Sequence, residues 1–335
     1  MNRKTSPRPL NVSFRHGSPS ERIFRERTGL PVAAAIAPGV KATPAHDLRF
    51  HGGKTIAQLH FMNFYVGADV WPADDVTNID KSLAAAMADA HLNNVMEQYF
   101  PAQISSTFDG SEKLAGPAPG TVSQGDIEAM VASLATQGKF AGRDLGSTVF
   151  NFMLPPGTVL NDDAKPTVSI SRNAQAIRKN PIPDDDDGNS LQGLGGYHGS
   201  VHVNNGNTVY YAVGVYSETR ADGTRNGIPV FDKPWKNVVA TFYHELNEAR
   251  TDADVEDAIR AGNDPNATKF LGWTSDQGEE CGDFPVFESG NDLSTVFQEV
   301  PLTAGGGTVP VQFQYSDNAH GPEGPRATPA PKTHA

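Results

Sequence analysis

The residues best suited to chemistry lie in segment 238–252, VVATFYHELNEARTD. His244 and Glu248 are four residues apart, so in a helix their side chains lie one turn apart and can reach one divalent cation. Glu245, next to His244, is placed to accept a proton from a water on that cation. This HExxE string is a variant of the HExxH string of zinc hydrolases. It predicts a zinc site with Glu245 as the catalytic base.

The same residues also have an interpretation without a metal. Average residue frequencies produce an HExxE string by accident in roughly one chain in forty of this length. A His–Glu pair on a solvated helix face needs no cation. Glu248 in place of a second histidine also adds negative charge, which strengthens cation binding but makes a bound water less acidic. The string must therefore be judged with the rest of the chain.

A third protein ligand is expected from the acidic segment 278–283, GEECGD. Glu280 and Asp283 are the candidates, because this glycine-broken segment can fold back toward the helix. Asp252 and Asp254 are alternatives: Asp252 lies a turn further along, and Asp254 is ten residues after His244, a spacing that some zinc peptidases use. A solvated acidic loop would account for the same residues without a metal.

Two strand-like runs, 196–203 and 208–215, surround a turn that contains Asn and Gly, and they predict a hairpin. Tyr197 and His198 in the first run are candidates to stabilise the oxyanion of a hydrolytic reaction. His198 and His202 are four residues apart, so they point to the same side of a regular strand. The alternative for each is a histidine that is hydrogen-bonded on a sheet face, and this is the preferred interpretation of His202.

Composition supports a globular protein that attracts cations. The chain has 335 residues, 38% of them hydrophobic, and a formal net charge of -12. Residues 1–54 carry ten Lys and Arg against three Asp and Glu, so the remainder is strongly acidic. Such a body is a poor nucleic-acid binder and a good cation binder. The lone Cys281 cannot form an internal disulfide, and nothing in the sequence activates it as a nucleophile.

The chain divides into three parts. Residues 1–50 are basic and rich in Ser and Pro and are expected to lack a fixed fold, residues 51–320 form one globular domain, and residues 321–335 form a Pro-rich disordered tail. No stretch has the length of a membrane span. The apolar run 30–40 is short and broken by prolines, which indicates a linker or pro-segment more than a signal peptide. The cellular location, cytoplasmic or exported by a non-classical route, and the oligomeric state are left open.

Periodicity predicts an α/β or α+β fold with a mixed sheet and packed helices, among them the HExxE helix as a zincin-like active-site helix. The run of four aspartates, 184–187, is a candidate calcium loop, although a solvated loop is the more common origin of such a run. The expected strands are 56–66, 103–108, 147–154, 196–203, 208–215 and 308–315, and the expected helices are 78–100, 123–137, 235–250 and 254–261.

Several blocks together resemble bacterial proteins that are distantly similar to the plant EXORDIUM, or phosphate-induced, family. The likeness spans about residues 50–318. Its blocks are HGGK near residue 51, QYF at the end of the 79–100 helix, FMLPPGT at 152–158, GYHGS at 196–200, HELNEARTD at 244–252, GWTSDQGEECGD at 272–283 and VQFQYSDNA near the end.

The form usual in those bacterial relatives is HELxExxTDP, then GW, then GxEIGD. Ala253 stands where Pro is common and Cys281 where Ile is common, which affects the turn and the packing more than the acids. The plant members do not keep the HExxE string, so they imply no metal chemistry. The matching positions are His244, Glu245, Glu248, Thr251, Asp252, Gly272, Trp273, Glu280 and Asp283.

These observations favour a metal-dependent hydrolase, most plausibly a zinc peptidase acting on a peptide or protein. His244 and Glu248 would bind Zn²⁺ with Glu280 or Asp283, and Glu245 would act as the base. The alternative is a non-catalytic EXORDIUM-like binding or signalling protein with a structural cation or no metal. A glycosidase with Glu245 and Glu280 as its paired carboxylates ranks last, because nothing else in the sequence suggests a sugar site.

Overall fold

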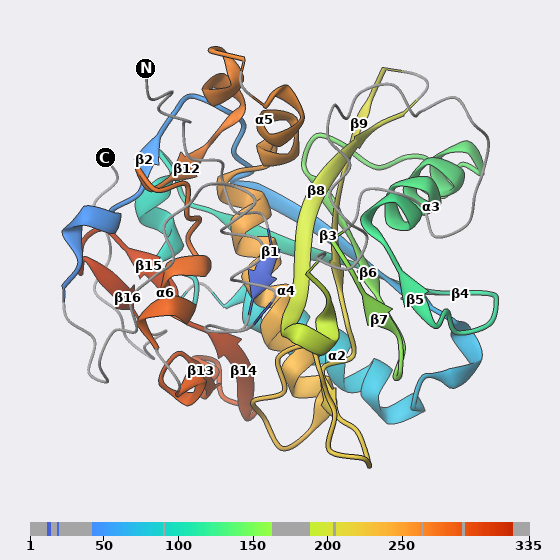
Figure 1. Cartoon of the computed structure of the whole chain (residues 1–335). Helices are drawn as coiled ribbons and strands as arrows, with labels where there is room; N and C mark the ends of the chain where they lie inside the picture. Colours follow the sequence, from blue (N-terminus) through green and yellow to red (C-terminus); the bar gives the residue numbers. More distant parts are fainter. Residues whose placement is uncertain are drawn as a thin grey trace.

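The computed structural model describes residues 12–14, 19, 42–89, 91–162, 188–203, 206–262, 264–289 and 292–323. The predicted calcium loop at 184–187 lies outside the described residues, as do most of the leader and the tail from residue 324. The chain is a mixed α/β protein with a mixed central sheet and several helices (Figure 1). The predicted mixed sheet with packed helices is thereby confirmed.

The central sheet has six strands in the order β1-β8-β9-β6-β3-β4. Strand β3 is parallel to β4 and β6, and β6 is parallel to β9. Strands β8 and β9 pair antiparallel and form a hairpin. The inner parallel strands β3, β6 and β9 are mostly apolar and buried because helices cover both faces, whereas the edge strand β4 is mostly polar. Their bounds are β1 Val12–Phe14, β3 Gln58–Val66, β4 Ser105–Leu114, β6 Thr148–Met153, β8 Leu194–His202 and β9 Thr208–Gly214.

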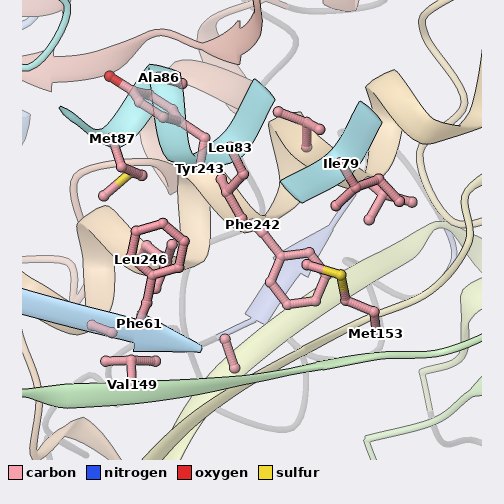
Figure 2. Packing of buried hydrophobic residues seen from close by; sticks show 14 of the residues in the cluster. Phe61, Ile79, Leu83, Ala86, Met87, Val149, Met153, Phe242, Tyr243 and Leu246 are labelled. Carbon is pink, nitrogen blue, oxygen red and sulfur yellow. The ribbon is translucent and has the colours of Figure 1, made fainter. Parts of the chain in front are cut away.

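Helices α2 (Ala73–Ala88) and α4 (Pro234–Thr251) cover one face of the sheet, and α3 (Gln124–Thr136) covers the other. Alternate residues of β3 go to opposite faces: Phe61 joins the cluster with α2 and α4, whereas Phe64 joins the cluster with α3. Figure 2 shows Phe242 and Leu246 of α4 between the side chains of α2 and the sheet. Full burial of such a side chain stabilises the fold by about 1.5–3 kcal/mol.

The predicted helix 78–100 is wrong at both ends, since helix α2 begins already at Ala73. Helix α2 ends at Ala88, and the chain continues through turns to the short 3-10 helix η3 (Met96–Tyr99). The Asp89 side chain accepts hydrogen bonds from the backbone N–H groups of His91 and Leu92. The Asn93 side chain donates to the carbonyls of residues 86, 87 and 89. These side chains satisfy the backbone groups that a continuing helix would use, so the helix stops there.

The predicted start of the second helix is confirmed. Ser123 precedes α3, and its hydroxyl accepts the backbone N–H of Asp126, whose carboxylate accepts the Ser123 N–H in return. This reciprocal pair is a capping box, and it explains why the helix begins at residue 124.

Residues 42–50, which the composition placed in the leader, pack on the globular body. Leu48 is buried and its N–H donates to Asp317. The His46 ring stacks on Phe284 at 3.6 Å and bonds to Glu279. No helix in the described part of the chain is long and apolar enough to cross a membrane.

Smaller elements complete the fold. Those around the candidate site are α5 (Val255–Ala261), α6 (Asp283–Glu288) and β14 (Thr308–Gln312). The remaining strands are β2 (Arg49–Phe50), β5 (Thr121–Val122), β7 (Val159–Leu160), β10 (Glu218–Thr219), β11 (Arg225–Asn226), β12 (Trp273–Thr274), β13 (Phe297–Pro301), β15 (Gln314–Ser316) and β16 (Gly321–Glu323). The other 3-10 helices are η1 (Pro44–His46), η2 (Ala68–Val70), η4 (Ser190–Gln192), η5 (Ala267–Phe270) and η6 (Leu293–Thr295).

Candidate metal centre

Helix α4 places the HExxE residues inside the protein. Its apolar face, which includes Val238 and Phe242, packs in the core. The opposite face is buried as well, because every residue from Asn237 to Thr251 is buried. A helix that carries His, Glu and Arg side chains without solvent must satisfy them within the protein. The HExxE string is therefore not a pair of solvated surface side chains.

His244, Glu248 and Asp283 form the first group of candidate ligands. Their ligand atoms lie within 4.8 Å of one another. His244 Nε2 is 3.0 Å from Glu248 Oε2 and 4.0 Å from Asp283 Oδ1. The helix supplies the first two residues, and Asp283 comes from the start of α6. The predicted return of the acidic segment toward the helix is confirmed.

The other side of the His244 ring is held by Gln312 at the end of β14. His244 Nδ1 lies 2.7 Å from Gln312 Oε1. The amide of Gln312 is oriented in turn, because its Nε2 donates to the Gly282 carbonyl and leaves Oε1 as the acceptor. The Nδ1 atom therefore carries a proton, and in the neutral imidazole Nε2 presents its lone pair to Glu248 and Asp283. Such a second hydrogen bond is a regular feature of histidines that bind metals.

His198, Glu245 and Glu248 form a second group, which shares Glu248 with the first. His198 Nδ1 is 3.4 Å from Glu245 Oε2 and 3.7 Å from Glu248 Oε2. His198 Nε2 lies 3.5 Å from Glu280 Oε1. Glu280 is thus next to His198, whereas Asp283 is the acid that completes the group around His244.

Gly282 allows the acidic segment to approach the helix. A Cβ at this position would lie 2.4 Å from His244 Nδ1 and 2.9 Å from Glu248 Oε1, so any larger residue would displace a candidate ligand. Its backbone N–H donates to Glu248 Oε1 at 3.0 Å. Neither Gly282 nor Gln312 was among the site residues predicted from the sequence. The sequence features that could have indicated them are the glycine within the acidic segment, for Gly282, and the polar residue at the end of an otherwise apolar strand, for Gln312.

Burial governs the electrostatics of the centre. The six residues His198, His244, Glu245, Glu248, Glu280 and Asp283 are each at most 3% exposed. Burial raises the pKa of Glu280 well above its usual range, and the nearby Glu248 raises it further. Burial alone would lower the pKa of His244, but the carboxylates of Glu248 and Glu245 reverse this and raise it to about 10. Without a cation, the centre must hold protons to limit repulsion among its acids.

The residues fit a divalent cation. Neither carboxylate oxygen of Glu280 forms a hydrogen bond within the described part of the chain, although both are buried. His198 Nε2 approaches Glu280 Oε1 only to 3.5 Å, so this buried carboxyl group is poorly satisfied, and a cation would remove that cost. Imidazole nitrogen and carboxylate oxygen are both ligands that zinc accepts. The donor set and its burial therefore suit a metal ion, whose removal would leave several acids in one enclosed space.

The other sequence candidates belong to neither group of candidate ligands. Tyr197 packs on the opposite side of the sheet against Tyr211 in the cluster with α3, so its predicted oxyanion role is wrong. Side chains alternate along β8, so of these two neighbours His198 is the one that faces α4. Asp252 accepts the Gly272 N–H at the end of α4, and Asp254 accepts the Tyr210 hydroxyl.

Two further residues are explained without catalysis. Cys281 is buried, and its sulfur contacts Thr251 and Gln314. Burial raises the pKa of its thiol well above the usual range, which argues against a nucleophilic thiolate. His202 is exposed and bonds to Asp257 and Thr208 at the sheet edge. The preferred interpretation of His202 as a hydrogen-bonded sheet residue is confirmed.

Comparisons with known proteins give no independent identification. No protein-family model, curated protein or solved structure matches this chain. The resemblance to the EXORDIUM-like proteins therefore stays a prediction.

Proposed function

We propose that this protein is a metal-dependent hydrolase, a zinc peptidase in which α4 serves as a zincin-like active-site helix. One observation carries the proposal: the Gln312 amide accepts a hydrogen bond from His244 Nδ1 and thereby orients the ring with Nε2 toward Glu248 and Asp283. A histidine buried only for packing would not need its second nitrogen surrounded by carboxylates. His244, Glu248 and Asp283 would hold the ion.

Zinc in this place would supply a Lewis acid and lower the pKa of a bound water toward neutrality. The chain supplies the proton acceptor. Glu245 extends from the same helix into the same group of residues, and burial raises its pKa, which suits a carboxylate that must take up and release a proton.

His198 positions the base in this proposal. Its Nδ1 lies 3.4 Å from Glu245 Oε2, and its Nε2 lies 3.5 Å from Glu280 Oε1. Both ring nitrogens thus face carboxylates, so the ring is better placed to orient Glu245 than to stabilise an oxyanion. The predicted oxyanion role of His198 is replaced here by a positioning role.

The second candidate function is a non-catalytic protein with a structural cation. The observation that favours it is burial, since no residue of the centre is more than 3% exposed. Structural zinc sites are closed, whereas catalytic sites keep an open position for water or substrate. Glu245 separates the two candidates, because a structural site does not need a base.

The test compares peptide hydrolysis by zinc-loaded wild type and Glu245→Gln. The proposal expects the variant to keep its zinc and to lose hydrolysis at least about 100-fold, the usual contribution of a general base. Glu279→Gln is the matched control, because Glu279 is buried nearby but bonds to Ser275 and His46 outside the centre. Zinc-loaded wild type that hydrolyses no peptide in a mixed-sequence library would favour the structural cation instead.

A further inference from the structure

The edge of the central sheet beside His198 is occupied by a piece of the N-terminal leader. Strand β1 pairs antiparallel with β8, with Val12 opposite Tyr197, Ser13 opposite Gly196 and Phe14 opposite Leu194. Without β1, β8 would be the edge of the sheet. Because the pairing is antiparallel, the N-terminal end of β1 is the end next to His198.

Strand β1 also lies along the two helices that carry the candidate ligands. Its backbone comes within 8 Å, Cα to Cα, of both α4 and α6. Figure 1 shows β1 between β8 and α6, in front of α4. A three-residue segment from a region about 180 residues away in sequence thus runs past the candidate metal centre as an extended chain.

An open strand edge is a general peptide-binding surface. Its unpaired N–H and C=O groups accept an extended peptide as an added strand, and the backbone bonds give affinity for many sequences. Extended binding also suits a peptide hydrolase, because it presents successive carbonyls along a fixed line. The paired region of β8 contains Gly196, where a Cβ would lie 2.4 Å from the Val213 carbonyl, so β8 fits closely against its neighbours here.

Charge indicates which peptides fit this edge. The leader is basic, with Arg8 and Arg15 on either side of β1, and residues 1–54 carry ten Lys and Arg against three Asp and Glu. The rest of the chain is acidic, with seventeen Lys and Arg against thirty-six Asp and Glu. Opposite charges of this kind favour association and select the partner.

We propose that the β8 edge is the substrate-binding surface for extended basic peptides, and that β1 occupies it in the intact chain as an internal inhibitor. The substrate assignment rests on the proposed hydrolase function, whereas the binding of a peptide to this edge does not. A peptide bound in the direction of β1 would place its N-terminal end beside His198. Removal or displacement of β1 opens the surface.

The test uses the full chain with the inactivating Glu245→Gln change and a labelled peptide of residues 8–18, RPLNVSFRHGS. Ser13→Pro weakens β1, because proline lacks the N–H that a paired strand needs. We expect the peptide to bind the Ser13→Pro chain at least about tenfold more tightly than the parent, since the tethered strand competes at an effective concentration in the millimolar range. Ser18→Pro, in the same leader but outside β1, is the control and should bind like the parent.

Hydrogen exchange on the parent chain gives a second readout that does not depend on the variant's folding. Excess peptide should speed exchange at residues 12–14 while β8 stays protected, because the added peptide replaces β1. Equal affinity of the parent and the Ser13→Pro chain for the peptide would overturn the proposal. So would unchanged exchange at residues 12–14 when the peptide concentration is several times the effective concentration of the tethered strand β1. A peptide with both arginines replaced by glutamate should bind at least tenfold more weakly, and equal binding would overturn the charge argument.

The outcome is separate from that of the proposed function. Both measurements read peptide binding and are made with and without zinc. If the chain binds the peptide but no metal, the hydrolase proposal fails while the binding surface stands. If the chain binds metal but the peptide never displaces β1, the binding-surface proposal fails while the hydrolase proposal stands.

Discussion

Glu248 is the residue on which both groups of candidate ligands depend. It belongs to the group around His244 and to the group around His198. Its Oε1 accepts the Gly282 N–H, which leaves Oε2 directed at the two histidines. A carboxylate with one oxygen fixed by the backbone and the other facing imidazoles has the geometry of a ligand that is oriented before a metal arrives.

Gln312 should control zinc affinity without contacting the metal. Gln312→Leu keeps a similar volume but removes the acceptor for His244 Nδ1, so the ring can rotate and change tautomer. We expect zinc affinity to fall about 10- to 100-fold, the usual effect of losing such a hydrogen bond. Competition with a coloured chelator measures it. Gln314→Leu, on the neighbouring strand β15, is the control, and equal losses in the two variants would refute the role given to Gln312.

Gly282 should tolerate no side chain. In Gly282→Ala the new methyl group would overlap His244 Nδ1 and Glu248 Oε1. We expect the free energy of unfolding to fall by about 1–3 kcal/mol, as for other overpacked sites, together with weaker zinc binding. Urea unfolding measures the change. Gly120→Ala has no atom within 4 Å of its Cβ and should cost much less, and a harmless Gly282→Ala would show that the acidic segment does not fit closely against α4.

Among the secondary-structure elements, the sequence predicted the helices whose apolar residues recur at a regular spacing. Periodicity predicted helices 235–250 and 123–137, which agree with α4 and α3 to within a residue at each end. The end of α2 was missed because its termination depends on side-chain hydrogen bonds. Asn93 folds back to the last carbonyls of the helix, whereas the apolar spacing continues past them.

The cap at the end of α2 is testable. Asn93→Ala leaves the carbonyls of Ala86 and Met87 without their side-chain donor in a buried position. We expect a loss of about 1–3 kcal/mol in the free energy of unfolding, the cost of buried groups left without a partner. Thermal and urea unfolding would measure it. Asn78→Ala, a half-buried position on the same helix, is the control, and equal effects would contradict the capping argument.

Helix α5 carries a residue that should make stability depend on pH. Burial raises the pKa of Glu256 to about 7, although Arg260 opposes the shift. Above about pH 4.5 the unfolded chain releases the Glu256 proton, whereas the folded chain keeps it up to about pH 7. The contribution of the Glu256 side chain to the free energy of unfolding is therefore fully present at low pH and is lost as the pH rises through 7.

Glu256→Gln should remove that dependence. Between pH 4.5 and pH 8 the free energy of unfolding of wild type should fall by on the order of 2 kcal/mol more than that of the variant. Urea unfolding at both pH values provides the measurement. Glu128→Gln, which removes another carboxylate from Arg260 at a less buried position, is the control. A stability difference that stays constant with pH would rule out a protonated Glu256 in the fold.

At the scale of the whole molecule, the candidate centre is assembled from distant segments. His198 comes from β8, His244 and Glu248 from α4, Asp283 from α6 and Gln312 from β14. The sequence indicated the residue types and the return of the acidic segment, but not the part of β14, because the placement of a distant strand depends on long-range contacts that no local pattern encodes. Tyr197 illustrates the limit, since only the register of β8 decides that it faces away.

The metal content of protein purified without chelators or a His-tag decides whether α4 holds a cation. Elemental mass spectrometry should find about one equivalent of zinc in wild type, in Glu245→Gln and in the Glu279→Gln control, and almost none in Glu248→Gln. This result would establish that α4 holds a metal through Glu248 and not through the adjacent glutamate. Wild type without metal, or zinc that is unaffected by Glu248→Gln, would contradict the account.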